Sequence, residues 1–300
     1  MTPVTDSMST EDVRNTSDLG MILAEADIED LEILVDYITD RGTGRLTLDS
    51  AMCKILVGAK ANQQYGPTER ALIAQEILEF GGNTLGNAYR KARTMFAGSF
   101  LDAVLPNAAP TVAYGEIVRD VASHLRVKMP EVAAVADVEM VIVRKILGKA
   151  VEKMSEEEKE GIAKELGLGS VPTGPGALAL LIQSARLGGF TTYKLATMVA
   201  NAVAKALLGK GLTLTTTATF MRGIGVALGP IGWAITAIWT LADLSSPAYR
   251  VTMPAVVQIA YMRNKLIAKR TYDACPKCEA IVERTDRFCS SCAAPLGEAA

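Results

Sequence analysis

The sequence is poor in histidine and in aromatic residues, with one histidine, His124, and 5% aromatics among 300 residues. A single histidine excludes metal centres built from several imidazoles, and any Ser-His-Asp or Cys-His site would need His124 itself. The phosphate-binding motif GxxxxGK[ST], the zinc motif HExxH and the nucleophile motif GxSxG are also missing. We therefore expect a protein that is not an enzyme, in which His124 has a structural or surface position.

The overall composition indicates a folded chain rather than a disordered one. Hydrophobic residues make up 49%, charged residues make up 21%, and the mean hydropathy is +0.22. A net charge of -2 gives the whole chain no attraction to nucleic acids. Residues 1–20 are polar and contain no apolar run, so they predict a flexible polar arm rather than a signal peptide, and a cytoplasmic location.

Charge is distributed unevenly along the chain. Residues 1–50 carry twelve acidic and three basic side chains, whereas residues 171–262 carry six basic and one acidic side chain. The acidic N-terminal part could help to mask the cationic part, although surface charge pairs are weak and are screened by salt.

Helical periodicity dominates residues 21–167. One apolar stripe consists of Ile28, Leu31, Val35 and Ile38. Pro67 predicts the start of a helix that ends at Gly81-Gly82, and Ser155 with Glu158 predicts a capping box. Because alternating strand patterns are scarce, we predict an all-α multi-helix bundle with an N-terminal helical domain over residues 21–167. A Gly/Pro-rich hinge at 167–176 follows it and is predicted to be the main internal boundary, with a loop inside one bundle as the alternative.

An apolar helical segment is predicted over residues 168–270, where twenty uncharged residues lie between Arg222 and Asp243. A continuous helix of this length spans about 30 Å, the thickness of a bilayer core. Gly229-Pro230 interrupts the run, because proline removes a backbone hydrogen bond and clashes with the preceding turn. The pattern therefore predicts a glycine-rich apolar helical hairpin that bends near Gly229-Pro230.

Several residues of this hairpin are candidates for contact with a membrane or with a partner helix. They are Gly225, Gly229, Pro230, Trp233 and Trp239. The two glycines form a GxxxG pair that allows close helix approach, and tryptophan favours the membrane interface. Asp243 and Arg250 form a candidate polar pair, since an unpaired charge is expensive to bury there. A hairpin buried in a soluble bundle is the alternative.

Four of the five cysteines lie near the C-terminus as two Cys-x-x-Cys pairs, namely Cys275, Cys278, Cys289 and Cys292. Four thiolates at this spacing complete a tetrahedral shell around zinc, with Zn–S distances of about 2.3 Å. So short a segment has no adequate core, so the metal must supply its folding free energy. We predict a structural Zn²⁺ ribbon over residues 271–300, with a pair of redox dithiols as the alternative. The fifth cysteine, Cys53, is predicted to be a buried hydrophobic residue.

Residues 275–296 resemble the short zinc ribbons appended to many bacterial proteins, except that Glu279 and Ala293 stand where such ribbons often carry glycine. Two other stretches, LIAQEILEFGGNTLGN (72–87) and SPAYRVTMPAVVQIAYMR (246–263), resemble the bacterial YaaW family, which is sometimes grouped with ubiquinol–cytochrome c chaperones. This resemblance spans roughly 25–265. It implies a mostly helical protein without established enzymatic activity, to which the polar arm and the ribbon are additions.

Three hypotheses for function follow from these patterns. The first is a non-enzymatic protein that associates peripherally or conditionally with the inner membrane through its hairpin, with the zinc ribbon as an interaction module. Such a protein would switch between a shielded soluble form and a membrane-engaged form. The second is a soluble assembly factor or chaperone-like protein whose apolar surface binds a protein partner; a homo-oligomer fits both hypotheses. The third is nucleic-acid binding through the ribbon, which the acidic residues there disfavour.

Overall fold

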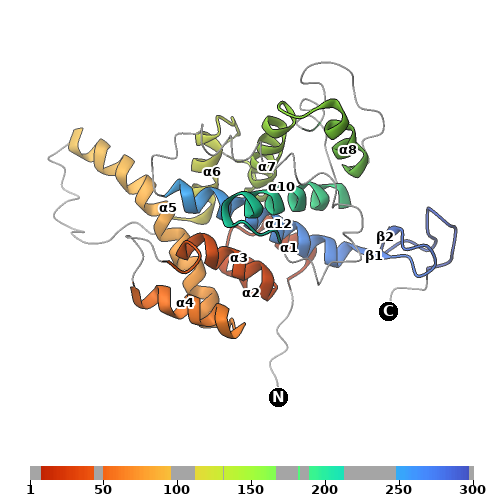
Figure 1. Cartoon of the computed structure of the whole chain (residues 1–300), viewed down its shortest axis with the longest axis horizontal. Helices are drawn as coiled ribbons and strands as arrows, with labels where there is room; N and C mark the ends of the chain where they lie inside the picture. The colour runs from red at the N-terminus through yellow and green to blue at the C-terminus, as the bar shows by residue number, and fades with distance from the viewer. Residues whose placement is uncertain are drawn as a thin grey trace. The chain divides into compact units, whose positions relative to one another are not determined.

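The structure, a computed structural model, describes residues 8–43, 50–95, 112–130, 132–166, 182, 189–212 and 248–296, with the backbone alone at 50 and 83–95. The helices in chain order are α1 (Thr10–Asn15), α2 (Leu19–Ala24), α3 (Ile28–Thr39), α4 (Ser50–Asn62), α5 (Pro67–Met95), α6 (Tyr114–His124), α7 (Val135–Val151), α8 (Glu156–Leu166), α10 (Phe190–Leu208) and α12 (Tyr249–Thr271) (Figure 1). One antiparallel sheet joins strands β1 (Tyr272–Ala274) and β2 (Ile281–Glu283). The mostly helical class is thereby confirmed.

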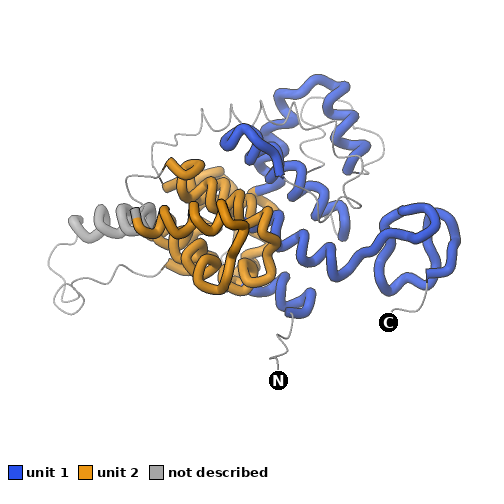
Figure 2. The backbone as a smooth tube through the Cα atoms, turned by 60° about the horizontal axis from the view of Figure 1, so that its bottom comes forward, with its two compact units in different colours: residues 1–16, 143–238, 259–300 blue, residues 17–142, 239–258 orange. Residues whose placement is uncertain are grey.

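The chain forms two compact units (Figure 2). Unit 1 comprises residues 1–16, 143–238 and 259–300, and unit 2 comprises residues 17–142 and 239–258. Helices α7 and α12 contribute residues to both units. The predicted glycine-rich hairpin lies outside the described residues. Within the described residues, no helix is long and apolar enough to cross a membrane.

Two helix starts predicted from local sequence signals are confirmed. Helix α5 begins at Pro67. Proline is favoured at this position because the first N–H of a helix has no intrahelical partner, so its absence costs no hydrogen bond. At the start of α8, the backbone N–H of Ser155 donates to the Glu158 carboxylate at 2.8 Å, and the Glu158 N–H donates to Ser155 Oγ at 3.3 Å. This reciprocal pair is the predicted capping box, and α8 buries Ile162 and Leu166 as expected.

Within residues 1–20, where the sequence predicts a flexible polar arm, the structure has the helix α1. Ser9 caps this helix, since its Oγ accepts from the Asp12 N–H at 3.1 Å while its own N–H donates to the Asp12 carboxylate at 3.0 Å. The Ser9 hydroxyl also donates to this carboxylate at 2.6 Å, and this bond, followed by the bond from the Ser9 N–H, lowers the pKa of Asp12. Val13 is fully buried. Local capping and the burial of Val13 thus help to make this short polar segment helical.

The predicted end of α5 at Gly81-Gly82 is wrong, because α5 continues to Met95. The glycine at 81 is explained by packing instead. A Cβ atom at this position would lie 2.3 Å from Cδ1 and 2.4 Å from Cγ1 of Ile117, a buried residue of α6. Gly81 therefore allows α6 to approach the middle of α5.

We expect a Gly81→Ala variant to lower the free energy of unfolding by about 1–2 kcal/mol. Overpacking against Ile117 costs about 1–3 kcal/mol, and the better helix propensity of alanine offsets up to about 1 kcal/mol of it. Gly58 of α4 supplies a matched control, because a Cβ there meets nothing within 4 Å. Gly58→Ala should raise stability by about 0.5–1 kcal/mol. Urea titration of both variants measures the difference, and equal effects would contradict the packing explanation.

At the start of α12, the side chain of Tyr249 is packed against α6 and its hydroxyl is hydrogen-bonded. Its ring stacks on His124, with the centroids 4.1 Å apart, and its hydroxyl bonds to the Asp120 carboxyl. Burial, above all, raises the pKa of both Asp120 and Tyr249. His124 thus joins α6 to α12 within unit 2, in the structural position expected for it.

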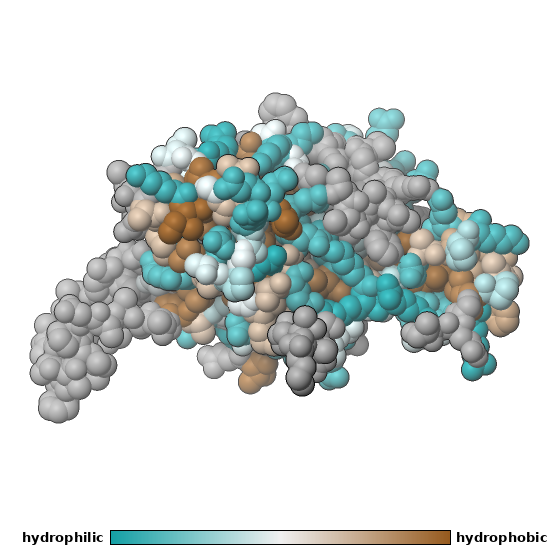
Figure 3. Space-filling model, turned by 90° about the horizontal axis from the view of Figure 1, so that it is seen from below, coloured by the Kyte–Doolittle hydropathy of each residue, from teal (hydrophilic) through white to brown (hydrophobic). Residues whose placement is uncertain are grey.

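The described surface in Figure 3 is mainly hydrophilic, with separate hydrophobic patches between polar side chains. Large hydrophobic side chains that are exposed in the described residues are Met21, Ile28, Ile55, Val57, Val132 and Phe288. Scattered apolar side chains of this kind are ordinary on protein surfaces.

The predicted burial of Cys53 is wrong, because this residue of α4 is partly exposed. The buried side chains among the described residues of α4 are Leu56 and Ala59.

Candidate metal centre

Residues 272–296, which we call the four-cysteine module, follow directly from the last residue of α12. The module opens with β1, which pairs with β2 so that Tyr272 lies opposite Glu283 and Ala274 lies opposite Ile281. Phe288 and Pro295 form a further antiparallel bridge. These pairings place a Cys-x-x-Cys loop after β1 and a second such loop after residue 288.

The two cysteine loops have the same backbone hydrogen bonds. In the first loop, the Cys275 N–H donates to Ala280 O and the Glu279 N–H donates to Cys275 O, both at 2.8 Å. In the second, the Cys289 N–H donates to Ala294 O and the Ala293 N–H donates to Cys289 O, again at 2.8 Å. This repeat means that each Cys-x-x-Cys pair lies on a tight turn of one geometry.

Each turn needs a left-handed residue directly after its second cysteine. Glu279 has φ 59° and Ala293 has φ 56°, although neither is glycine. A side chain in this region costs about 1–2 kcal/mol, because its Cβ approaches the following carbonyl oxygen. The two departures from the usual ribbon pattern therefore add strain to the turns without changing their geometry.

An Ala293→Gly variant should bind metal about two- to fivefold more tightly, because glycine removes the left-handed strain at the cost of some unfolded-state entropy. Competition between the full chain and a zinc chelator measures the affinity. Ala274→Gly is the matched control, since Ala274 lies in β1 without a positive φ. That variant should leave the affinity unchanged or weaken it; a gain as large as that at Ala293 would contradict the strain argument.

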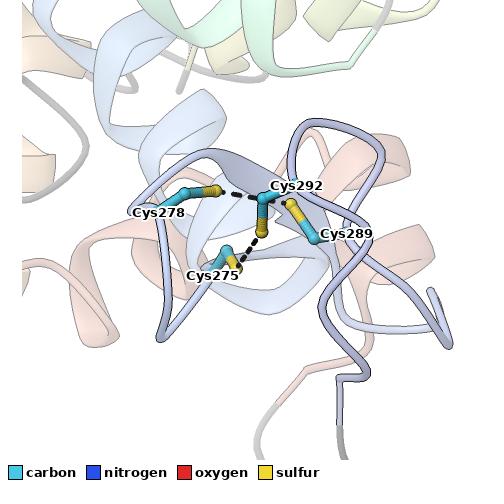
Figure 4. Close-up of side chains that lie close together, drawn as sticks. All are labelled: Cys275, Cys278, Cys289 and Cys292. Atoms are coloured by element: carbon cyan, nitrogen blue, oxygen red, sulfur yellow. Dashed lines mark hydrogen bonds between the residues drawn. The ribbon is translucent and has the colours of Figure 1, made fainter.

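The four sulfur atoms converge on one point (Figure 4). Sγ of Cys275 lies 3.7 Å from Sγ of Cys292, Sγ of Cys278 lies 3.6 Å from Sγ of Cys289, and the four ligand atoms all lie within 4.8 Å of one another. A tetrahedral shell with metal–sulfur bonds of about 2.3 Å has edges of roughly 3.8 Å. The observed spacing fits a metal ion held by four thiolates.

Backbone hydrogen bonds favour ionisation of the first ligand. The N–H groups of Cys278 and Lys277 bond to Sγ of Cys275 and lower the pKa of this thiol to about 6. At Cys292 the Ala294 N–H lowers the pKa, but hydrogen bonds with the other three thiols and burial outweigh it and raise the pKa to about 12. The thiol of Cys292 therefore retains a proton that a bound cation would displace.

The hydrophobic core of the module is very small. Its buried members are Cys275, Val282, Cys289 and Ala294, and Ala280, Cys292 and Leu296 pack partly buried against them. Three of these seven residues are cysteines of the cluster. So little apolar burial does not offset the chain entropy of about 25 ordered residues. A metal ion held by the four thiolates would contribute the missing folding free energy.

The structure brings together the four cysteines predicted as ligands, but it does not describe the other candidates as a group. Arg250 is exposed on α12. Its predicted partner Asp243 lies outside the described residues, as do Gly225, Gly229, Pro230, Trp233 and Trp239. Tyr272, which packs against the first residue of α10, was not predicted from the sequence. The glycine pair directly before Phe190 was the available signal for a close contact there.

Comparisons with known proteins identify relatives but not a fold template. No protein-family model matches the chain, and no solved structure matches it. A UPF0174 protein of Helicobacter pylori (strain J99) is 37% identical over 156 residues, which are 51% of this chain and 62% of that relative. The UPF0174 protein YaaW of Escherichia coli (strain K12) is 25% identical over 260 residues, which are 85% of this chain and 96% of YaaW.

A further relative establishes the family. Another Helicobacter pylori UPF0174 protein, from strain 26695, is 33% identical over 203 residues, covering 88% of its own length and 66% of this chain. The resemblance to YaaW found from residues 72–87 and 246–263 is thereby confirmed, although these names state no function. The chain belongs to the UPF0174 family.

Proposed function

We propose that this UPF0174 protein is a non-enzymatic binding protein and that its four-cysteine module is a structural zinc ribbon that recognises a partner. The observation that carries the proposal is the convergence of four Sγ atoms within 4.8 Å of one another. Sulfur ligands in tetrahedral geometry favour zinc or iron–sulfur chemistry over hard cations such as magnesium. Zinc fits a single-ion site of this size.

The ligand set supports a structural role rather than a catalytic one. Catalytic zinc sites keep one coordination position for water or substrate, whereas structural sites are filled by four protein ligands. Cys275, Cys278, Cys289 and Cys292 would fill all four positions of a bound zinc ion. The small core of the module supports the same role, because the metal would contribute folding free energy.

Elemental analysis of the purified full chain tests the zinc assignment. We expect one zinc per chain, released together with the loss of module structure when a chelator is added. Mass spectrometry after alkylation tests the redox alternative, because each disulfide removes two hydrogens and blocks two thiols. A chain that contains disulfides between these cysteines and takes up no zinc would overturn the proposal.

Membrane association is the second candidate function, and the uncharged residues 223–242 favour it. Basic residues around this run would add about 1 kcal/mol each near an anionic surface. Flotation of the full chain with phosphatidylglycerol vesicles tests this function, and phosphatidylcholine vesicles test the charge dependence. A Trp233→Glu variant should lose binding, whereas Phe288→Glu, which alters an exposed aromatic residue of the module, should keep it.

The alternative is a soluble assembly factor that uses the same apolar residues to bind a protein partner or another copy. Absence of flotation by the native chain, together with a stable homo-oligomer in light scattering, would favour this alternative. Flotation lost only in Trp233→Glu would favour the membrane.

A further inference from the structure

The four-cysteine module contacts α10 through the first residue of β1. The ring of Tyr272 meets that of Phe190 edge to face, with the centroids 5.5 Å apart and an interplanar angle of 70°. The hydroxyl oxygen of Tyr272 also accepts a hydrogen bond from the backbone N–H of Phe190. Phe190 is the first residue of α10, so the module supplies an acceptor at a helix terminus, where the first backbone N–H groups have no i−4 carbonyl within the helix.

Gly189 has the geometry that this contact requires. It is the N-cap of α10, with φ 66° and no side-chain cap of its own. A Cβ atom on Gly189 would lie 2.5 Å from Oη of Tyr272. The tyrosine hydroxyl therefore occupies the space in which an N-cap side chain would lie. Like such a side chain, it accepts a hydrogen bond from the helix start, although Tyr272 is distant in the sequence.

The same helix turn connects the module to the rest of unit 1. The Phe190 ring lies 5.6 Å from that of Tyr193, which in turn stacks at 6.2 Å on Tyr261 of α12. Nζ of Lys194 lies 5.5 Å from the Phe190 ring and donates to the carbonyl oxygen of Glu165 at the end of α8. A displacement of Phe190 would therefore disturb contacts to both α12 and α8.

We infer that metal binding in the module holds the first turn of α10 through Tyr272, which makes this contact a metal-dependent clamp inside unit 1. The inference rests on the proposed zinc ribbon. Tyr272 is positioned by the pairing of β1 with β2, and this short pairing lies beside a core made largely of the ligand cysteines. Loss of the metal releases β1, and α10 then loses both its cap and its aromatic contact.

The clamp gives the metal site a regulatory role. Helix α10 lies in the sequence between the predicted hinge at 167–176 and the uncharged run at 223–242. The state of its first turn is therefore linked to the part of the chain for which membrane or partner binding is proposed. Metal occupancy of the module would determine how well the first turn of α10 is ordered. The metal itself would not contact the membrane or the partner.

Hydrogen exchange of the full chain, with zinc bound and after chelation, tests the clamp. One hydrogen bond and one aromatic pair predict about tenfold faster exchange for peptides covering 188–195 after zinc removal. Peptides from α5 in unit 2 serve as the internal control and should not change. Equal exchange at 188–195 with and without zinc, in a chain shown to bind zinc, would overturn the clamp.

Two variants separate the clamp from general unfolding of the module. Tyr272→Phe keeps the ring but removes the acceptor, so it should bind one zinc and yet show faster exchange at 188–195 even when loaded. Phe288→Ala is the control, since Phe288 is 64% exposed on the same module. It should retain the metal-dependent protection. Zinc binding without any effect of Tyr272→Phe would overturn the role of the hydroxyl. A native chain that takes up no zinc would instead refute the proposed ribbon, and the clamp with it.

Discussion

A Cys289→Ser variant is expected to lose about 100-fold or more in zinc affinity. Structural zinc sites of this kind contribute about 10–16 kcal/mol, so one of four ligands accounts for roughly 3 kcal/mol. Cys289 is buried, and its Sγ lies 3.6 Å from that of Cys278, so water has little access to replace the lost ligand. A hydroxyl is a poor substitute because zinc prefers the softer thiolate.

The measurement is competition for zinc with a chelator of known affinity, followed by limited proteolysis of the module. Cys53→Ser is the matched control, because it makes the same chemical change at a cysteine of α4 that is not part of the cluster. It should retain native affinity and native proteolysis. Equal zinc loss in both variants, or full binding by Cys289→Ser, would contradict a four-thiolate site.

The convergence of the four cysteines was predictable because the pattern that causes it is local. Two Cys-x-x-Cys pairs within eighteen residues can bring four sulfurs together whatever the rest of the chain does. The strain at Glu279 and Ala293 was foreseen only as a departure from the usual glycine pattern. Their left-handed conformations depend on backbone hydrogen bonds within each loop, which the sequence does not display.

The helix boundaries show the same division between local and distant causes. The capping box at Ser155 and Glu158 was predictable because both partners lie within four residues. The supposed stop at Gly81 was wrong because its cause is Ile117, which lies 36 positions further along the chain. Glycine in a helical pattern marks either an end or a close packing contact, and local sequence cannot distinguish the two.

The contact of Tyr272 with Gly189 could not be predicted either. More than eighty residues separate them, and an aromatic residue before a cysteine pair does not by itself indicate which part of the chain it contacts. Composition limits the number of such residues, however. With 5% aromatics in the chain, a row of rings formed by Phe190, Tyr193, Tyr261 and Tyr272 uses a large share of the available side chains.

The second large effect is expected at Arg263, within the stretch that identified the family. Its side chain is 1% exposed, and its Nη1 donates to Val13 O at 2.6 Å and to Thr16 O at 2.9 Å. These carbonyls lie at the C-terminal end of α1, where the helix dipole favours a cation. Arg263→Met should lower the free energy of unfolding of unit 1 by about 3 kcal/mol, because buried acceptors lose a charged donor.

Urea unfolding and hydrogen exchange at residues 10–16 together measure this effect, with exchange reporting the release of α1 directly. Arg250→Met is the matched control, because Arg250 is exposed on the same helix and should change stability by less than about 0.5 kcal/mol. Arg263→Lys should fall between native and Arg263→Met, since lysine keeps the positive charge but carries it on a more strongly hydrated ammonium group. If Arg263→Met left α1 as protected as in the native chain, the anchoring role of the guanidinium would be refuted, and the helix at residues 10–15 would depend on its Ser9 cap and on Val13 alone.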